Sequence, residues 1–131
     1  MVMNVAEIDH LIRAARFGQE RARPHLSKYR VGAALLDSQQ RIHIGCNFEF
    51  DNYSNTIHAE ECALSVAVAA GALELKAICV VTSGDDLAWP CGMCRQSLYE
   101  IGGPDLLVIA ANGSRHEVKS MAELLPCAFR L

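Results

Sequence analysis

Apolar residues recur at helical spacing in the first segment of the chain. The positions that repeat every three or four residues are Val5, Ile8, Leu11, Ile12 and Ala15. Asn4 stands just before the repeat, and Glu7 follows it by three residues, which is the arrangement of a capping box. The pattern predicts an amphipathic helix that begins after Asn4 and ends near Gly18.

Two β-rich segments and a nearly all-apolar segment come next. Residues 29–36 (YRVGAALL) and 41–48 (RIHIGCNF) flank the polar stretch DSQQ, and this pattern predicts two strands joined as a hairpin. Residues 57–70 (IHAEECALSVAVAA) are apolar on almost every side and are followed by Gly71. They predict a helix that is buried on most sides and ends at the glycine.

The second half of the chain predicts further strands and helices. Residues 77–82 (AICVVT) form a continuous apolar run, typical of a strand covered on both faces. We expect a helix from about Cys91, because Pro90 favours extended geometry just before it. The remaining predicted elements are a strand at 106–110, an edge segment at 116–118 and a short helix capped by Ser120 and Glu123.

The order of these elements defines the expected architecture. After the opening helix the order is β-β-α-β-α-β, which fits a layered α/β domain with helices on both faces of one sheet. A chain of 131 residues has the usual size of one domain and can bury a real core. We therefore expect a single domain over residues 1–131.

Composition and charge exclude several classes of protein. With 51% hydrophobic and 21% charged residues, the chain is too apolar to be disordered. A net charge of -3 leaves no basic field for nucleic acid or anionic lipid. The apolar runs are shorter than the roughly 18 residues that cross a membrane, and the first residues lack the pattern of a secretory signal. We expect a cytoplasmic protein that binds neither nucleic acid nor membrane.

The six cysteines do not have the pattern of a disulfide framework. Cys62 and Cys79 lie within apolar runs, where a cysteine in a reducing compartment acts as a small hydrophobic residue. Cys91 and Cys94 form a close pair, and such a pair is more often a metal site.

Two short motifs at predicted helix starts carry the candidate chemistry, HAE at 58–60 and PCGMC at 90–94. The segment before each motif should deliver it to one end of the sheet, so the two helix starts can face each other. Cys94 follows Cys91 by three positions, which places both sulfur atoms on one side of the first turn. With His58 they supply three ligands to a tetrahedral zinc ion and leave the fourth position for water, as in a catalytic site.

Each motif taken alone has a plainer interpretation. His58 suits an ordinary histidine at a helix end, and the CxxC pair suits a redox site in a thioredoxin-like unit. Together, with Glu60 after the histidine and Pro90 before the cysteines, the motifs resemble the H-x-E…P-C-x-x-C signature of zinc-dependent deaminases. The combination favours a catalytic zinc site.

Further segments narrow the resemblance to one family. The motifs that resemble the small cytidine deaminases, in the same order, are SKYRVGAALL (27–36), GCNFE (45–49), HAE (58–60), PCGMCRQ (90–96) and LLPCAF (124–129). HAE and PCxxC also suit nucleobase and tRNA adenosine deaminases, whereas NFE, CRQ and the tail are typical of nucleoside deaminases. The similarity covers nearly the whole chain.

This resemblance implies a fold, an assembly and an activity. The fold would be a three-layer α/β/α sandwich with a mixed five-stranded sheet, and the assembly a homotetramer with active sites shared between subunits. The activity would be zinc-dependent hydrolytic deamination of cytidine or deoxycytidine to the uridine form plus ammonia, within pyrimidine salvage. Zinc would lower the pKa of a bound water molecule toward about 7, and Glu60 would carry protons to N3 and then to the departing amine.

The resemblance also assigns roles to individual residues. The implied zinc ligands, one ion per chain, are His58, Cys91 and Cys94, and the catalytic residue is Glu60. The implied substrate contacts are Asn47 and Glu49 to the ribose, Tyr29 to the base, the backbone of Ala59, and Phe129 from a neighbouring subunit. Tyr53 matches a residue at a subunit junction. A carboxylate suits a sugar hydroxyl and repels phosphate, which favours a nucleoside over a nucleotide.

The chain departs from the small tetrameric type at two positions. That type usually has cysteine at position 58 and arginine at 61, where this chain has His58 and Glu61. Zinc with two thiolates and a neutral imidazole has zero net charge, whereas three thiolates would leave a charge of -1 for an arginine to offset. The two departures are therefore mutually consistent, but they leave the preferred base open.

Three alternative functions stay open at this point. A deaminase of another cytosine-bearing nucleoside, such as a modified cytidine or a nucleoside antibiotic, would keep every catalytic residue and differ near Tyr29, Phe50 and the C-terminus. A tRNA adenosine deaminase would need a basic surface, against which the net charge argues. A zinc-stabilised scaffold without activity would leave Glu60 without a role.

Overall fold

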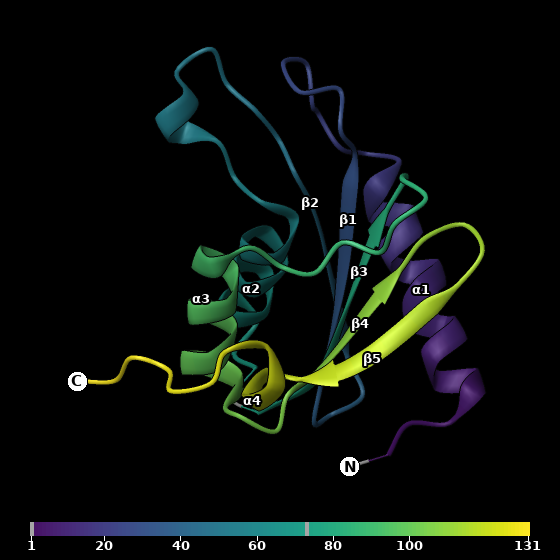
Figure 1. The fold of residues 1–131 in the computed structure, drawn as a ribbon, viewed down its shortest axis with the longest axis vertical. Helices are drawn as coiled ribbons and strands as arrows, with labels where there is room; N and C mark the ends of the chain where they lie inside the picture. Colours follow the sequence, from purple (N-terminus) through teal and green to yellow (C-terminus); the bar gives the residue numbers. More distant parts are fainter. Residues whose placement is uncertain (1, 73) are drawn as a thin grey trace.

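A five-stranded sheet forms the centre of the protein in a computed structural model that describes residues 2–72 and 74–131 (Figure 1). The strands are β1 (Val31–Asp37), β2 (Ile42–Cys46), β3 (Leu75–Thr82), β4 (Leu107–Ala111) and β5 (His116–Ser120). Their order across the sheet is β2-β1-β3-β4-β5. The β3–β4 pair is parallel and the other pairs are antiparallel, so the sheet is mixed, as expected.

Helices cover both faces of this sheet (Figure 1). They are α1 (Val5–Gln19), α2 (Ala59–Ala69), α3 (Gly92–Gly102) and the short α4 (Met121–Leu124), with a 3-10 turn η1 at Tyr53–Asn55. One apolar core joins α1 to the sheet, and a second joins α2, α3 and α4 to the opposite face. The structure confirms the three-layer α/β/α sandwich.

The predicted capping boxes are present at the starts of the first and the last helix. Asn4 accepts a hydrogen bond from the backbone of Glu7 at 2.8 Å at the start of α1. Ser120 accepts one from the backbone of Glu123 at 3.2 Å at the start of α4. Each box satisfies backbone donors that a helix start otherwise leaves unpaired, so both helices begin where the sequence predicted.

The central strand β3 shows why the uninterrupted apolar run at 77–82 predicts a strand that is covered on both faces. Ile78 and Val80 point into the core beneath α2 and α3, whereas Cys79 and Val81 point into the core beneath α1. Successive strand residues face opposite sides, so a strand covered on both sides needs apolar residues throughout. Residues 77–82 of the strand are buried on both sides, as predicted, whereas Leu75 and Lys76 at its start are partly exposed.

Two glycines let the helices approach the sheet closely. A side chain at Gly32 would meet the backbone of Ala15 in α1, and one at Gly45 would come within 2.4 Å of the backbone nitrogen of Ala63 in α2. Only glycine fits such close approaches. The contact at Gly45 sets the height of α2 above β2 and thereby the position of the residues at its start.

The prediction that α2 is buried on most sides was wrong for the single chain. Its buried residues lie on the face that packs on the sheet, but Val66 and Val68 are exposed on the other face. The helix covers the part of the sheet formed by β1 and β2 and contacts α3 on one flank, so its outer face has no neighbour within the described chain.

A buried ionic cluster holds the β1–β2 hairpin. Asp37, only 1% exposed, lies 2.9 Å from Nε2 of His43 and accepts a hydrogen bond from Nε of Arg41 at 2.8 Å. The backbone nitrogens of Gln39 and Arg41 also donate to it, each at 2.9 Å. Burial alone would raise the pKa of Asp37, but these hydrogen bonds, led by that of His43, hold it well below its usual range.

Within residues 2–72 and 74–131, no helix has the length and apolar character needed to span a bilayer.

Candidate active site

Two helix starts place the candidate zinc ligands. His58 immediately precedes α2 and Cys91 immediately precedes α3, each with an extended backbone. Neither side chain caps its own helix, which leaves both free to point away from it. Cys94 lies in the first turn of α3, so it shares a side of the helix start with Cys91, as predicted.

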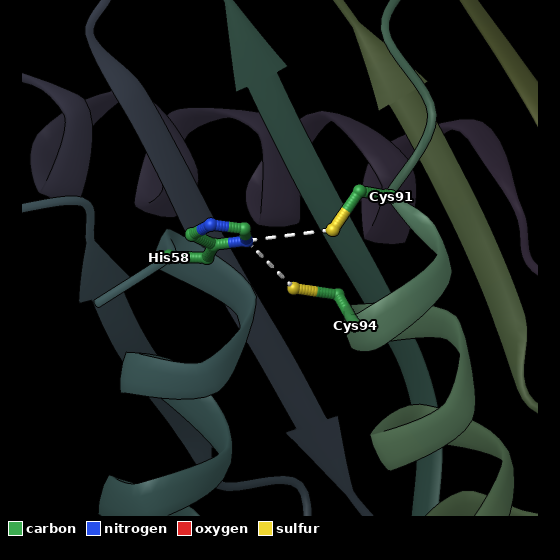
Figure 2. Close-up of side chains that lie close together, drawn as sticks. All are labelled: His58, Cys91 and Cys94. Atoms are coloured by element: carbon green, nitrogen blue, oxygen red, sulfur yellow. Dashed lines mark hydrogen bonds between the residues drawn. The ribbon is translucent and has the colours of Figure 1, made fainter. Parts of the chain in front are cut away.

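The three side chains converge on one point between the helices (Figure 2). Nδ1 of His58 lies 3.5 Å from Sγ of Cys91 and 3.3 Å from Sγ of Cys94. All the candidate ligand atoms lie within 4.8 Å of one another. In a tetrahedral zinc site, bond lengths of about 2.0–2.3 Å separate neighbouring ligand atoms by about 3.3–3.8 Å. The donor atoms therefore have the spacing and the chemical type that zinc requires.

The surroundings of the cysteines also fit a bound cation. Burial raises the pKa of the Cys94 thiol, and the nearby charges of Glu60 and Cys91 raise it further. A thiolate at that position needs a positive charge beside it, which a divalent metal provides. Cys94 is buried, whereas Cys91 is exposed and lines a pocket. The ligand set is thus closed toward the core and open toward that pocket.

Glu60 is a buried carboxylate that lies close to the candidate ligands. It lies in the first turn of α2, is 6% exposed and lines the same pocket as His58 and Cys91. Burial raises the pKa of Glu60 above its ordinary value. A carboxyl group whose pKa is raised toward neutrality is suited to take up and release a proton.

The pocket itself has a volume of about 330 Å³ and lies at one end of the sheet, beside the two helix starts. Its lining residues are Ser27, Tyr29, Val31, Asn47, Glu49, Thr56, His58, Ala59, Glu60, Val80, Thr82, Ala88, Trp89 and Cys91. The pocket is within the usual size for a small organic ligand. Its floor is apolar at Val31 and Val80, and its wall contains His58, Cys91 and Glu60.

Asn47 and Glu49 lie in the wall of this pocket, but both also make hydrogen bonds within the protein. Asn47 accepts from the backbone of Val31 at 2.9 Å and donates to the carbonyl of Tyr29 at 2.8 Å. Glu49 accepts from two backbone nitrogens, each at 2.9 Å, and from the hydroxyl of Ser27 at 2.6 Å. The hydrogen bond from the Ser27 hydroxyl does most to lower the pKa of Glu49, so the group is held as a carboxylate.

The remaining candidate residues divide into two groups. Tyr29 and Ala59 line the pocket. Phe129 does not, because the C-terminal tail runs along α3, where its carbonyl accepts a hydrogen bond from Gln96 at 3.1 Å. The Phe129 ring is 66% exposed, and Tyr53 is also exposed, at the rim of an adjoining pocket. The structure thus brings all the candidates except Phe129 to one end of the sheet.

Sequence reasoning did not single out seven of the lining residues: Ser27, Val31, Thr56, Val80, Thr82, Ala88 and Trp89. Ser27 acts through Glu49, more than twenty positions away, and Thr82 ends an otherwise apolar strand. Trp89 directly precedes the PCGMC motif, but a tryptophan in a loop carries no sequence signal of its own for a pocket. Only Thr82, a polar residue at the end of the apolar run 77–82, could have been recognised from the sequence.

Comparison with known proteins agrees with this geometry. Residues 6–110 match a family described as the cytidine and deoxycytidylate deaminase zinc-binding region. A cytidine deaminase of Sporosarcina psychrophila is 38% identical over 125 residues, which cover 94% of this chain and 91% of that protein. A probable cytidine deaminase of Dictyostelium discoideum is 39% identical over 129 residues, covering 97% and 86% of the two chains.

Solved structures show the same similarity. A crystal structure of cytidine deaminase from Burkholderia pseudomallei superposes with a TM-score of 0.90 at 38% identity, covering 97% of this chain and 100% of that one. The cytidine deaminase of Mycobacterium tuberculosis gives a TM-score of 0.84 at 33% identity, covering 95% and 98%. The similarity therefore extends over the whole sheet and all the elements that carry the pocket.

Proposed function

The chain belongs to the family of cytidine and deoxycytidylate deaminases with a zinc-binding region, and on that premise we propose that it hydrolyses cytidine or deoxycytidine to the uridine form and ammonia. The observation that carries the proposal is the convergence of His58, Cys91 and Cys94 on one pocket that also contains a buried glutamate. A redox role for the cysteine pair is less suited to this arrangement, because the imidazole completes a metal-binding set.

His58, Cys91 and Cys94 would hold one zinc ion per chain, and zinc would supply the Lewis acidity that makes water a nucleophile near neutral pH. Three protein ligands leave room for a non-protein ligand, as in other catalytic zinc sites. The exposed side of this ligand set, at Cys91, faces the pocket where the base would enter.

Glu60 moves the protons of the reaction. Its carboxylate accepts a proton from the attacking water and delivers it to N3 of the cytosine ring, which makes C4 a better electrophile. The same group then takes the proton of the hydroxyl added at C4 and transfers it to the amine as the C4–N bond breaks, so water adds and ammonia leaves. Burial of Glu60 supports this double role, since the raised pKa of Glu60 narrows the energy gap between its two protonation states.

Asn47 and Glu49 hold the sugar. Both lie in the pocket wall, and the hydrogen bonds that fix Glu49 also orient its carboxylate before a ligand arrives. An anionic acceptor suits a ribose hydroxyl and disfavours a 5′-phosphate. Tyr29 packs on the base, and the backbone of Ala59 at the start of α2 supplies a hydrogen bond to it.

The functional unit is a homotetramer in which Phe129 reaches the pocket of a neighbouring subunit. Its exposed ring, the exposed Tyr53 and the apolar outer face of α2 at Val66 and Val68 support such an assembly. A single chain leaves these apolar side chains in water, and a neighbouring subunit would bury them.

The cellular role is pyrimidine salvage in the cytoplasm, on a small nucleoside and without a nucleic-acid or membrane partner. All six cysteines are free thiols, which suits a reducing compartment. The net charge of -3 is unfavourable for binding a phosphate backbone.

The test is an ultraviolet assay of cytidine turnover on purified protein, with and without a strong zinc chelator, extended to deoxycytidine, modified cytidines and cytosine-bearing antibiotics. We expect turnover of the first two that is lost on chelation and restored by added zinc. Turnover of an antibiotic nucleoside alone would instead assign the chain a specialised substrate. A protein that binds zinc but turns over none of these nucleosides would contradict the proposal.

A further inference from the structure

Within the part of the chain that the structure describes, the pocket lining includes one side-chain oxygen that is shielded from solvent and has no hydrogen-bond partner in the free protein, Oγ1 of Thr82. Among the described residues, three buried side-chain nitrogen or oxygen atoms have no hydrogen-bond partner, and they belong to His25, Glu61 and Thr82. Only Thr82 lines the proposed active-site pocket. A buried hydroxyl without a protein partner destabilises the fold. The stability of the protein therefore does not explain a threonine at this position, whereas the binding of a ligand would.

The position of Thr82 in the sheet places it in the floor of the pocket. It is the last residue of β3 and 3% exposed. Side chains two residues apart on a strand share a face, so Thr82 shares the face of Val80, whose side chain packs beneath α2 and α3. Val31 is directly opposite Thr82 on β1. These three residues form a floor that is apolar except for one hydroxyl.

The same row of residues separates Thr82 from the groups proposed to hold the sugar. Asn47 is bonded to the backbone of Val31, so Val31 lies between Asn47 and Thr82 across the sheet. The chain that leaves Thr82 leads to Trp89 and Cys91, which line the same pocket, and Cys91 is one of the candidate zinc ligands. A nucleoside whose ribose lies against Asn47 and Glu49 would therefore place its base, not its sugar, over Thr82.

We propose that the Thr82 hydroxyl is a substrate-binding group that makes a hydrogen bond to the pyrimidine base, an inference that rests on the proposed nucleoside deaminase function. In the free protein the hydroxyl oxygen is shielded from solvent. Threonine has more than one allowed rotamer, so rotation about the Cα–Cβ bond can exchange the positions of the hydroxyl and the methyl group, and in the bound state the hydroxyl would face the pocket. The bound base supplies the partner that the protein lacks.

The isosteric variant Thr82→Val separates this role from a structural one. Valine keeps the shape and removes the hydroxyl, so the base would lose one hydrogen bond while the fold would lose an unpaired polar group. We expect the zinc-loaded variant to show an increase of about tenfold in the Kd for uridine and in the KM for cytidine. Its melting temperature should equal or exceed that of the wild type. Thr82→Ser, which keeps the hydroxyl, should stay within about threefold of wild type in Kd.

A series of sugars tests whether the contact is to the base. The factor lost in Thr82→Val should be the same for cytidine, 2′-deoxycytidine and 2′,3′-dideoxycytidine, because none of these changes alters the base. A loss that disappears when one sugar hydroxyl is removed would show a sugar contact and overturn the assignment. In a crystal structure of the wild type with uridine, Oγ1 of Thr82 should lie within hydrogen-bond distance of a base atom.

Several results would contradict the inference. Unchanged Kd and KM in Thr82→Val, or equal losses in Thr82→Val and Thr82→Ser, would show that the hydroxyl does not contact the base. A clearly lower melting temperature in Thr82→Val would show that the hydroxyl is already satisfied in the free protein. A wild-type protein without cytidine turnover would contradict the proposed function, whereas an active wild type with an unaffected valine variant would contradict only the role of Thr82.

Discussion

Sγ of Cys94 lies 3.3 Å from Nδ1 of His58, although 36 positions separate the two residues in the chain. The contact joins the first turn of α3 to the residue that precedes α2, and both helices pack on the same face of the sheet (Figure 1). The close approach of α2 to β2 at Gly45 fixes one side of the contact. The metal site is therefore built by the fold as a whole, with its ligands set on rigid helix starts.

Loss of the cysteine pair should remove the metal. We expect the purified wild type to contain one zinc per chain and the double variant Cys91→Ser/Cys94→Ser to contain almost none, because a lone imidazole cannot hold the ion. Elemental analysis after gel filtration measures this directly. The matched control is Cys127→Ser, which replaces an exposed cysteine outside the cluster and should keep full zinc content. Intact zinc in the double variant would show that these cysteines are not the ligands.

Asp37 should make the stability of the protein depend on pH in the acid range. Its pKa is lower in the folded state than in the unfolded chain, so its contribution to the free energy of unfolding is fully present above about pH 4 and is lost as the pH falls. Asp37→Asn should therefore be clearly less stable than the wild type at pH 7, and the gap should shrink at pH 3.

Urea unfolding of both proteins at several pH values measures that gap. Asp51→Asn is the matched control, because the Asp51 side chain is almost fully exposed and its change should leave the curve nearly unaltered. A gap between Asp37→Asn and the wild type that stays constant from pH 7 to pH 3 would show that the carboxylate does not act through its low pKa.

Phe129 should couple assembly to activity. Its ring is exposed in the single chain, and if it closes a neighbour's pocket, Phe129→Ala should cost on the order of 2 kcal/mol or more at that contact. We expect a smaller species in analytical ultracentrifugation together with reduced turnover. The matched control is Phe17→Ala. Phe17 is also exposed but lies on α1, so its replacement should change neither property. A fully active monomer carrying Phe129→Ala would contradict the shared site.

The sequence predicted the elements and the metal cluster because their signals are local. Each helix start carries its own capping pattern, as at Asn4 and Ser120, and the HAE and PCGMC motifs each occupy one helix start. The pattern of apolar residues distinguishes the strands, where they run without interruption or alternate, from the helices, where they recur every three or four residues. The convergence of the two motifs followed from the order of elements, since helices on one face of a sheet can begin at the same edge.

The features that the sequence did not predict depend on contacts between distant residues. The cluster of Asp37, Arg41 and His43 requires the hairpin register, and the hydrogen bond from Ser27 to Glu49 joins segments 22 positions apart. The exposed face of α2 could not be predicted either. The apolar residues of this helix predict burial on every side, unless it is known that the helix lies over the β1–β2 part of the sheet. Apolar pattern alone does not distinguish burial within a chain from burial between chains.

The histidine ligand and Glu61 should be linked by charge. His58→Cys adds a thiolate and takes the ligand set with zinc from neutral to -1, so kcat/KM should fall. Adding Glu61→Arg should restore part of the loss, because residue 61 lies close enough for its charge to raise the pKa of Cys94, alongside the larger effect of burial. Glu61→Arg alone should change little.

A double-mutant cycle on kcat/KM, with zinc content measured for each protein, gives the coupling between the two positions. Effects that simply add would show that charge balance is not the cause.

Glu60 is the residue on which the proposed chemistry depends, so the most direct measurement is cytidine turnover by Glu60→Gln beside the matched control Glu61→Gln, with zinc content determined for both. Glutamine keeps the shape of the side chain but cannot carry the proton. We predict that Glu60→Gln retains its fold and its zinc while kcat falls by about 10²–10⁴-fold, and that Glu61→Gln stays close to wild type. Near-normal turnover by zinc-loaded Glu60→Gln would contradict the account.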